Sequence, residues 1–300
     1  MQSAIPPICD YEGSGYRTDF WEGQGRDYED LAERAAVRRL LPSRGRRIAH
    51  LGAGFGRMTN ELGGYQQVVV LDYSRTLLRE AQARLGTGSR FVFVAADIYR
   101  LPLAPGSCDA ALMERVIHHF ADVPAALAQI RGALAPGAAF VLEYANKRNL
   151  KSILRYGMRQ QAWNPFDEAP VEFVELNFDF HPAYMARVLK AAGFTTRQRL
   201  AVSYFRFGPL KRALPASLLV ALDRLLQPTG DIAPFSPSVF TLNVAAGGTP
   251  LAALNGPLFK CLHCGAPLHD EGDTVACPNG DGRWALHDGI YDFKTEVTAG

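Results

Sequence analysis

The chain has 300 residues, of which 48% are hydrophobic and 21% are charged, with a formal net charge of +2 at pH 7. This composition predicts a soluble globular protein with one sizeable domain and a small one, and the near-neutral charge argues against a general polyanion-binding protein. We find no window with the roughly 18 apolar residues of a membrane span and no signal-peptide layout, so we expect a cytoplasmic protein.

The N-terminal region lacks the period of a helix or a strand. Residues 1–26 mix glycine, arginine and acidic residues with Tyr11, Tyr16, Phe20 and Trp21, and we interpret them as an aromatic-rich arm. Asp27 is expected to cap the first helix, which Pro42 would end. The main domain is predicted to span residues 27–245.

Strand-length apolar runs then alternate with helical stretches. The runs hardly alternate in polarity, as expected for strands buried on both faces, and they are Ile48–Leu51, Val68–Leu71, Phe91–Val94, Ala110–Met113 and Phe140–Leu142. Later strands are expected around residues 200–207 and 239–244. The pattern predicts an α/β fold, a Rossmann-like doubly wound sheet that is mostly parallel with an antiparallel last strand.

Two stretches interrupt this frame, at about residues 151–180 and 208–237, and we expect them to be cap insertions over the site. The second contains a leucine-rich helix between Pro215 and Pro228, whose leucines we expect mainly in the core. Small, turn-prone residues at 246–257 predict a linker to a small β-rich module at 258–296.

A glycine turn follows the first strand. Gly52, Gly54 and Gly56 allow a sharp backbone turn that exposes N–H groups at an expected helix N-terminus, where a carboxylate or phosphate can bind. The third glycine comes one residue sooner than in the G-x-G-x-x-G dinucleotide motif, which favours a cofactor without a pyrophosphate over NAD.

Two carboxylates follow the next two strands. Asp72 stands at the tip of the second strand, where a carboxylate can accept hydrogen bonds from ribose hydroxyls. Asp97 follows the third strand, where it can accept from an adenine amino group while Ile98 lies against the ring. Each residue could instead serve only as a turn or cap residue.

With these motifs in register, residues 28–245 resemble the class I S-adenosylmethionine (SAM) dependent methyltransferases, in the branch of small-molecule and quinone methyltransferases. The resemblance implies SAM as cofactor and a cofactor site at His50, Gly52, Ala53, Gly54, Gly56, Asp72, Tyr73, Asp97, Ile98 and Met113. His50 is a departure, because the family usually has an acid there that helps to hold the cofactor's ammonium group.

Methyl transfer mainly requires alignment of the acceptor, exclusion of water and, for some acceptors, removal of a proton. Candidate catalytic residues follow strands four and five, with His118 as the preferred base and Glu114 and Tyr144 beside it. His118 could equally be a structural residue of its turn. The arm's aromatic residues could cover the sulfonium or simply pack on the surface.

A basic stripe is predicted beyond strand five, because Lys147, Lys151, Arg155 and Arg159 recur every four residues. It would suit an anionic acceptor, although a solvated face neutralised by nearby acids is the alternative.

The C-terminal module contains Cys261 and Cys264 as one pair and, after twelve intervening residues, Cys277, which is zinc-ribbon spacing. The module resembles the zinc ribbon that accompanies many methyltransferases. In that pattern the fourth cysteine would fall at Gly280, so Asp281, His263, His269 or His287 would have to substitute, or the ribbon would fold without zinc.

These features predict a SAM-dependent methyltransferase for a small-molecule or lipid-like acceptor. The alternative is a methyltransferase-fold adaptor, or an RNA- or protein-directed enzyme, that uses the ribbon to dock its partner. A NAD-dependent oxidoreductase is a third and more distant reading.

Overall fold

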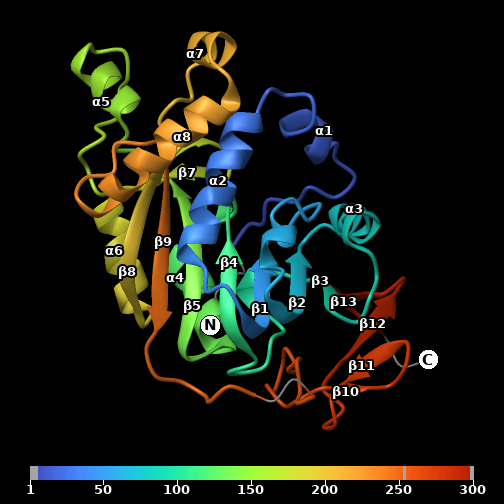
Figure 1. The fold of residues 1–300 in the computed structure, drawn as a ribbon. Helices are drawn as coiled ribbons and strands as arrows, with labels where there is room; N and C mark the ends of the chain where they lie inside the picture. Colours follow the sequence, from blue (N-terminus) through green and yellow to red (C-terminus); the bar gives the residue numbers. More distant parts are fainter. Residues whose placement is uncertain (1–5, 253–254, 298–300) are drawn as a thin grey trace.

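The computed structural model describes residues 6–252 and 255–297. Its main feature is a sheet of 11 strands in the order β10-β11-β12-β13-β3-β2-β1-β4-β5-β9-β8 (Figure 1). The strands within the predicted main domain that join this sheet are β1 (Gly45–Leu51), β2 (Tyr65–Asp72), β3 (Phe91–Ala95), β4 (Cys108–Met113), β5 (Leu134–Ala145), β8 (Phe194–Val202) and β9 (Ser238–Ala245). A separate hairpin contains β6 (Val171–Val174) and β7 (Asn177–Asp179).

Strands β1 to β5 pair in parallel, whereas β9 runs antiparallel to both β5 and β8. The predicted fold class, with a mostly parallel Rossmann-like sheet and an antiparallel last strand, is therefore confirmed. The five parallel strands fall on the predicted apolar runs, and they extend beyond them into residues that range from buried to exposed.

Helices cover both faces of this sheet. They are α1 (Tyr16–Phe20), α2 (Asp27–Leu40), α3 (Arg75–Leu85), α4 (Val123–Ala133), α5 (Leu150–Gly157), α6 (Pro182–Ala191), α7 (Gly208–Ala213) and α8 (Ala216–Leu226). Side chains of α4 and α6 share one core cluster, while those of α2, α3 and α8 share the other. Successive strand residues divide between these clusters, for example Val69 to the first and Val70 to the second. Burial on both faces explains why the strands are continuously apolar.

The turn after β1 differs from the expectation. Residues 52–58 form turns, and a short 3-10 helix, Thr59–Leu62, follows where we expected an α-helix N-terminus. Gly52 has φ of 69°, and a Cβ there would lie 2.2 Å from a Val116 methyl group. Only glycine fits this backbone without a clash.

Three other expectations about elements are corrected. Strand β8 ends at Val202 rather than near residue 207, and Asp27 is the first residue of α2 rather than its cap. In α8, Leu219 is buried, but Leu218, Leu222, Leu225 and Leu226 are exposed. The face of α8 turned inward also carries Asp223, whose Oδ1 accepts hydrogen bonds from Tyr28 Oη and Tyr204 N, and this polar contact sets which face is buried.

The C-terminal module extends the same sheet. Its strands β10 (His269–Asp270), β11 (Thr274–Ala276), β12 (Arg283–His287) and β13 (Ile290–Glu296) form an antiparallel meander. Strand β13 then pairs in parallel with β3, and Figure 1 shows the module beside β3 and α3. Among the helices of the described residues, none is long and apolar enough to span a bilayer.

Candidate functional site

A cavity lies at the carboxyl ends of β1 to β4, where open α/β sheets bind ligands. About 850 Å³ of space free of protein atoms, part of it open solvent, lies between its walls. Of the residues predicted for the cofactor or for catalysis, it is lined by Gly52, Ala53, Gly54, Asp72, Tyr73, Asp97, Ile98 and Glu114. The folded chain thus brings eight of the predicted residues to one cavity.

Asp72 joins the glycine turn to the end of β2. Its Oδ2 accepts a hydrogen bond from Gly54 N at 2.7 Å, and its Oδ1 accepts one from Ser74 N at 2.9 Å. Burial raises the pKa of this carboxyl group. Each oxygen retains a second lone pair, so Asp72 can still accept from a ligand hydroxyl.

Asp97 lines the cavity and caps a short 3-10 helix, Ile98–Arg100. Its Oδ1 accepts from Tyr99 N at 2.8 Å, and burial raises the pKa of the carboxyl group. Ile98 and Leu77 supply apolar surface to the same cavity. This combination of an acceptor and apolar walls suits a heterocycle with an exocyclic amino group.

His50 is fully buried behind the cavity wall and does not line it. Its Nδ1 lies 2.9 Å from Thr59 Oγ1, and its Nε2 lies 2.8 Å from Glu114 Oε2. Glu114, at the end of β4, does line the cavity. A carboxylate therefore reaches the site from β4, held by the histidine that stands where the family usually has an acid.

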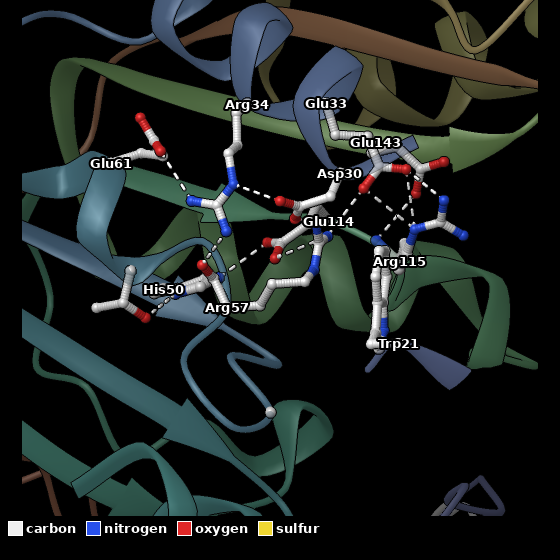
Figure 2. Close-up of polar contacts among 12 residues, drawn as sticks. Trp21, Asp30, Glu33, Arg34, His50, Arg57, Glu61, Glu114, Arg115 and Glu143 are labelled. Atoms are coloured by element: carbon white, nitrogen blue, oxygen red, sulfur yellow. Dashed lines mark hydrogen bonds and ion pairs between the residues drawn. The ribbon is translucent and has the colours of Figure 1, made fainter. Parts of the chain in front are cut away.

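A buried charged cluster adjoins this carboxylate (Figure 2). Figure 2 shows Glu33, from α2, pointing toward Arg57 and Arg115. Arg57 Nη2 is 2.8 Å from Glu33 Oε2 and 3.8 Å from Glu114 Oε1, and the Arg115 guanidinium also pairs with Glu33. Burial alone would raise the pKa of Glu33, but the charges of Arg115 and Arg57 bring it to about 2.

The aromatic arm contributes directly to the cavity, since Tyr11, Tyr16 and Trp21 line it. Trp21 covers both arginines, with its ring 3.7 Å from the Arg57 guanidinium carbon and 4.9 Å from that of Arg115. Phe20, the fourth aromatic residue expected here, is exposed. The sequence left open whether the arm's aromatic residues cover the cavity or pack on the surface. Tyr11, Tyr16 and Trp21 line the cavity.

The remaining predicted residues lie outside the cavity lining. Met113 and Tyr144 are buried in the core, and a Cβ on Gly56 would meet Leu85, so Gly56 permits close packing. Burial lowers the pKa of His118 well below its ordinary value, and its Nδ1 has no hydrogen-bond partner among the described residues.

The neighbouring His119 lines the cavity instead. Its Nδ1 is 2.9 Å from the Leu176 carbonyl oxygen, and its Nε2 is 3.3 Å from Tyr11 Oη. Because a carbonyl can only accept, Nδ1 carries the proton and Nε2 is left with a lone pair. Burial lowers the pKa of His119, which favours this neutral form.

The basic stripe predicted from the four-residue spacing is not continuous. Lys147 is buried, and its Nζ donates to the Ala169 carbonyl oxygen at 2.6 Å. Lys151, Arg155 and Arg159 are exposed on or just beyond α5.

The three predicted metal ligands converge in the C-terminal module. The sulfur atoms of Cys261, Cys264 and Cys277 lie within 4.8 Å of one another. Asp281 Oδ2 is 4.0 Å from Cys277 Sγ, whereas the Nε2 of His263 is engaged with Glu296 and its ring stacks on Trp284. Three thiols and a nearby carboxylate fit a tetrahedral zinc ion.

Comparison with known proteins agrees with this geometry. A family model described as a methyltransferase domain matches residues 49–142. The O-methyltransferase cnsE of Penicillium expansum is 28% identical over 45% of this chain and 52% of its own length. The demethylmenaquinone methyltransferase of Corynebacterium kroppenstedtii is 32% identical over 36% of this chain and 46% of its own length. Across the curated relatives, the chain spans only 26% to 52% of their length.

Solved structures show the same fold. A SAM-dependent methyltransferase from Mesorhizobium loti has a TM-score of 0.52 at 22% identity, covering 72% of this chain and 99% of that chain. A chain from the complex of the Haloferax volcanii Trm112 methyltransferase activator with a methyltransferase has a TM-score of 0.52 at 17% identity, covering 75% of this chain and 95% of that chain. The family model thus matches a methyltransferase domain within residues 49–142, and the solved structures share the fold of this chain.

Sequence reasoning assigned no role to Arg57 or Arg115, and of the two neighbouring histidines it preferred His118 as the base to His119, which lines the cavity. Arg57 directly follows the glycine turn, which was a usable signal. Arg115 has φ of 56°, a conformation that costs a non-glycine residue about 1–3 kcal/mol and clusters at functional sites, but this is visible only in the fold.

Proposed function

We propose that this chain transfers a methyl group from SAM to a small-molecule or lipid-like acceptor. The observation that carries the proposal is the cavity at the carboxyl ends of β1 to β4, where the glycine turn, Asp72 and Asp97 face one space. In this assignment Asp72 receives the ribose hydroxyls and Asp97 receives the adenine amino group. Ile98 and Leu77 form the apolar surface against the adenine ring.

The methionyl end of SAM carries an ammonium and a carboxylate, and the chain offers a matching pair of charges. Glu114 is the cavity carboxylate closest to the position where the family's acid is replaced by His50, so we assign it to the ammonium group. Arg57, 3.8 Å from Glu114, is assigned to the methionyl carboxylate. The carboxylate function would thus have moved from β1 to β4.

When bound, SAM supplies an electrophilic methyl group on its sulfonium. The chain aligns the acceptor and excludes water, for which the arm's Tyr11, Tyr16 and Trp21 form a cover. Where the acceptor must lose a proton, we assign its removal to His119 Nε2 in place of His118, because His119 lines the cavity and its unprotonated Nε2 is the nitrogen that accepts from Tyr11 Oη. The low pKa of His119 keeps this nitrogen available at neutral pH.

The first experiment measures S-adenosylhomocysteine binding by calorimetry and methyl transfer from labelled SAM to fractionated cell extract. Asp97→Ala should weaken binding at least tenfold, while Asp273→Ala, at an exposed acid of the C-terminal module, should not. His119→Asn should retain binding but lower turnover of a proton-losing acceptor about a hundredfold or more. Binding unchanged by Asp97→Ala would refute the site assignment.

The same experiment separates the alternative function. Intact cofactor binding, no methyl transfer to any fraction, and a partner protein or RNA that needs residues 258–296 would favour an adaptor. The fraction of the extract that accepts the labelled methyl group would show whether the acceptor is a quinone or another small molecule.

We also propose that Cys261, Cys264 and Cys277 hold a structural zinc ion and that Asp281 is its fourth ligand. The support is the convergence of the three sulfur atoms and the position of the Asp281 carboxylate beside Cys277. A carboxylate is an ordinary fourth ligand for zinc, and it restores a four-ligand set without a cysteine at position 280.

A further inference from the structure

The arm over the cavity consists of a five-residue helix, α1, and irregular backbone, so it needs ties to stay in place. One tie is Trp21 over the two arginines. A second begins at Glu12, on the part of the arm that also carries Tyr11. Glu12 Oε2 accepts from Arg75 N at 2.7 Å, and Glu12 Oε1 accepts from Thr76 Oγ1 at 2.6 Å.

These bonds place Glu12 at the N-terminus of α3, where a carboxylate is stabilised by unpaired backbone N–H groups and by the helix dipole. Burial alone would raise the pKa of Glu12, but the hydrogen bonds from Thr76 and Arg75 and the charge of Lys294 lower it to about 2. Glu12 therefore remains a charged anchor at every ordinary pH.

The C-terminal module supplies the cation for this anchor. Lys294 Nζ lies 3.4 Å from Glu12 Oε2 and 4.8 Å from the centre of the Tyr73 ring, and Tyr73 lines the cavity. The Lys294 side chain is only 16% exposed, so solvent screens this ion pair less than a surface pair.

Asp292, two residues earlier on β13, contacts both Arg75 and the backbone of Lys294. Its Oδ2 is 3.1 Å from Arg75 Nη1, and its Oδ1 accepts from Lys294 N at 3.0 Å. The parallel pairing of β13 with β3 sets Asp292 opposite Ala95, two residues before Asp97. Strand pairing thus fixes Lys294 and Asp292 next to the part of the cavity assigned to the nucleoside.

The C-terminal module also packs against the main domain through buried aromatic side chains. Phe259, Trp284 and Phe293 belong to the same buried cluster as the side chains of α4 and α6. Its backbone is joined to the main domain at a second place, between β3 and β4, where Lys260 N donates to the Pro102 carbonyl oxygen at 2.7 Å.

We propose that the C-terminal module is an internal clamp, in which β13 positions Lys294 and Asp292 to hold the N-terminal arm over the cofactor cavity and thereby sets the affinity for SAM. Lys294 and Asp292 are positioning residues, because they act through Glu12, Arg75 and Tyr73. The affinity part of this proposal rests on the proposed function, whereas the arm part does not.

The test compares Lys294→Met and Glu12→Gln with wild type and with the control Glu271→Gln. The control removes the Arg283–Glu271 ion pair, at 2.8 Å, which belongs to the same module but involves no arm residue. Two measurements are made on the full chain: calorimetry of S-adenosylhomocysteine binding, and hydrogen exchange of the backbone at residues 8–21.

Lys294→Met and Glu12→Gln should each weaken binding about fivefold to twentyfold and speed exchange in the arm, while Glu271→Gln changes neither. The double variant should be little worse than either single variant, because both remove the same tie. Lys294→Arg should restore most of the affinity. If Lys294→Met lowers the melting temperature sharply, affinity and arm exchange are measured on Lys294→Arg and Asp292→Asn instead. These two substitutions keep the packing, so they test the clamp without unfolding the module.

Arm exchange and affinity both unchanged in Lys294→Met would overturn the clamp. Failure of the wild-type protein to bind S-adenosylhomocysteine would instead contradict the proposed function. In that case the arm exchange of the same variants still decides whether the module holds the arm.

Discussion

At the scale of single residues, the most informative contact is the one between the His50 imidazole and the Glu114 carboxylate. An imidazole at the end of β1 cannot supply a negative charge, but it orients a carboxylate that reaches the cavity from the end of β4. Thr59 Oγ1 occupies the other ring nitrogen, so the orientation of His50 is fixed on both sides. In the proposed assignment, the methionyl site is built from two strands in place of one.

Glu114→Gln should weaken S-adenosylhomocysteine binding about tenfold or more, because a hydrogen bond between charged groups contributes roughly 1.5–3 kcal/mol. His50→Gln keeps a polar side chain beside Glu114 and should cost less. Calorimetry on the two variants checks this order. Wild-type affinity in Glu114→Gln would show that another group receives the ammonium.

At the scale of elements, Glu33 ties helix α2 to the cavity wall. It is fully buried, and Arg57, Arg115 and Arg206 surround it from the turn after β1, the end of β4 and the segment after β8. Strands and helices that are remote in the sequence therefore share one carboxylate (Figure 2). Loss of its charge would leave buried guanidinium groups without a counter-ion.

Glu33→Gln should lower the free energy of unfolding by about 3–5 kcal/mol at pH 7. The pKa of Glu33 is lowered in the folded state, to about 2, so its contribution is complete above its ordinary value of 4.5 and is lost as the pH falls toward 2. Urea unfolding of wild type and variant should therefore converge between pH 4.5 and 2.

The control for this measurement is Glu168→Gln. It breaks the exposed Glu168–Arg187 pair, which should contribute no more than about 0.5 kcal/mol. An equal loss in the two variants would contradict the assigned role of Glu33.

At the scale of the whole molecule, the C-terminal module and the main domain form one sheet. Strand β13 covers the edge of β3, which would otherwise expose unpaired backbone groups. A module of this size has a limited core of its own, and the thiol cluster joins the segment before β10 to the residue that follows β11. A bound zinc ion would stabilise the strands that position Lys294 and Asp292.

Removal of zinc with a chelator should release about one ion per chain, expose three reactive thiols of this cluster and lower the melting temperature. Asp281→Ala should weaken zinc binding about tenfold or more, whereas Asp273→Asn in the same module should not. Metal content by mass spectrometry and thiol titration measure these effects. A stripped chain that takes up no zinc would refute the metal site.

The order of strands and helices, the glycine turn and the acids at Asp72 and Asp97 could be predicted from the sequence. Burial on both faces makes a parallel strand continuously apolar, and the next residue after such a strand falls at the ligand edge of the sheet. The metal site at the three cysteines could also be predicted from the sequence, because their spacing is that of paired thiols on two tight turns that converge on one ion.

Only the tertiary structure decided which side chains meet across distant segments. The sequence favoured His118, but one residue of rotation along a short helix points His119 into the cavity and leaves His118 outside its lining. The pairing of His50 with Glu114, of Glu33 with its arginines, and of Glu12 with Lys294 joins residues 24 to 282 positions apart. Such contacts depend on sheet order and strand register, which local periodicity does not encode.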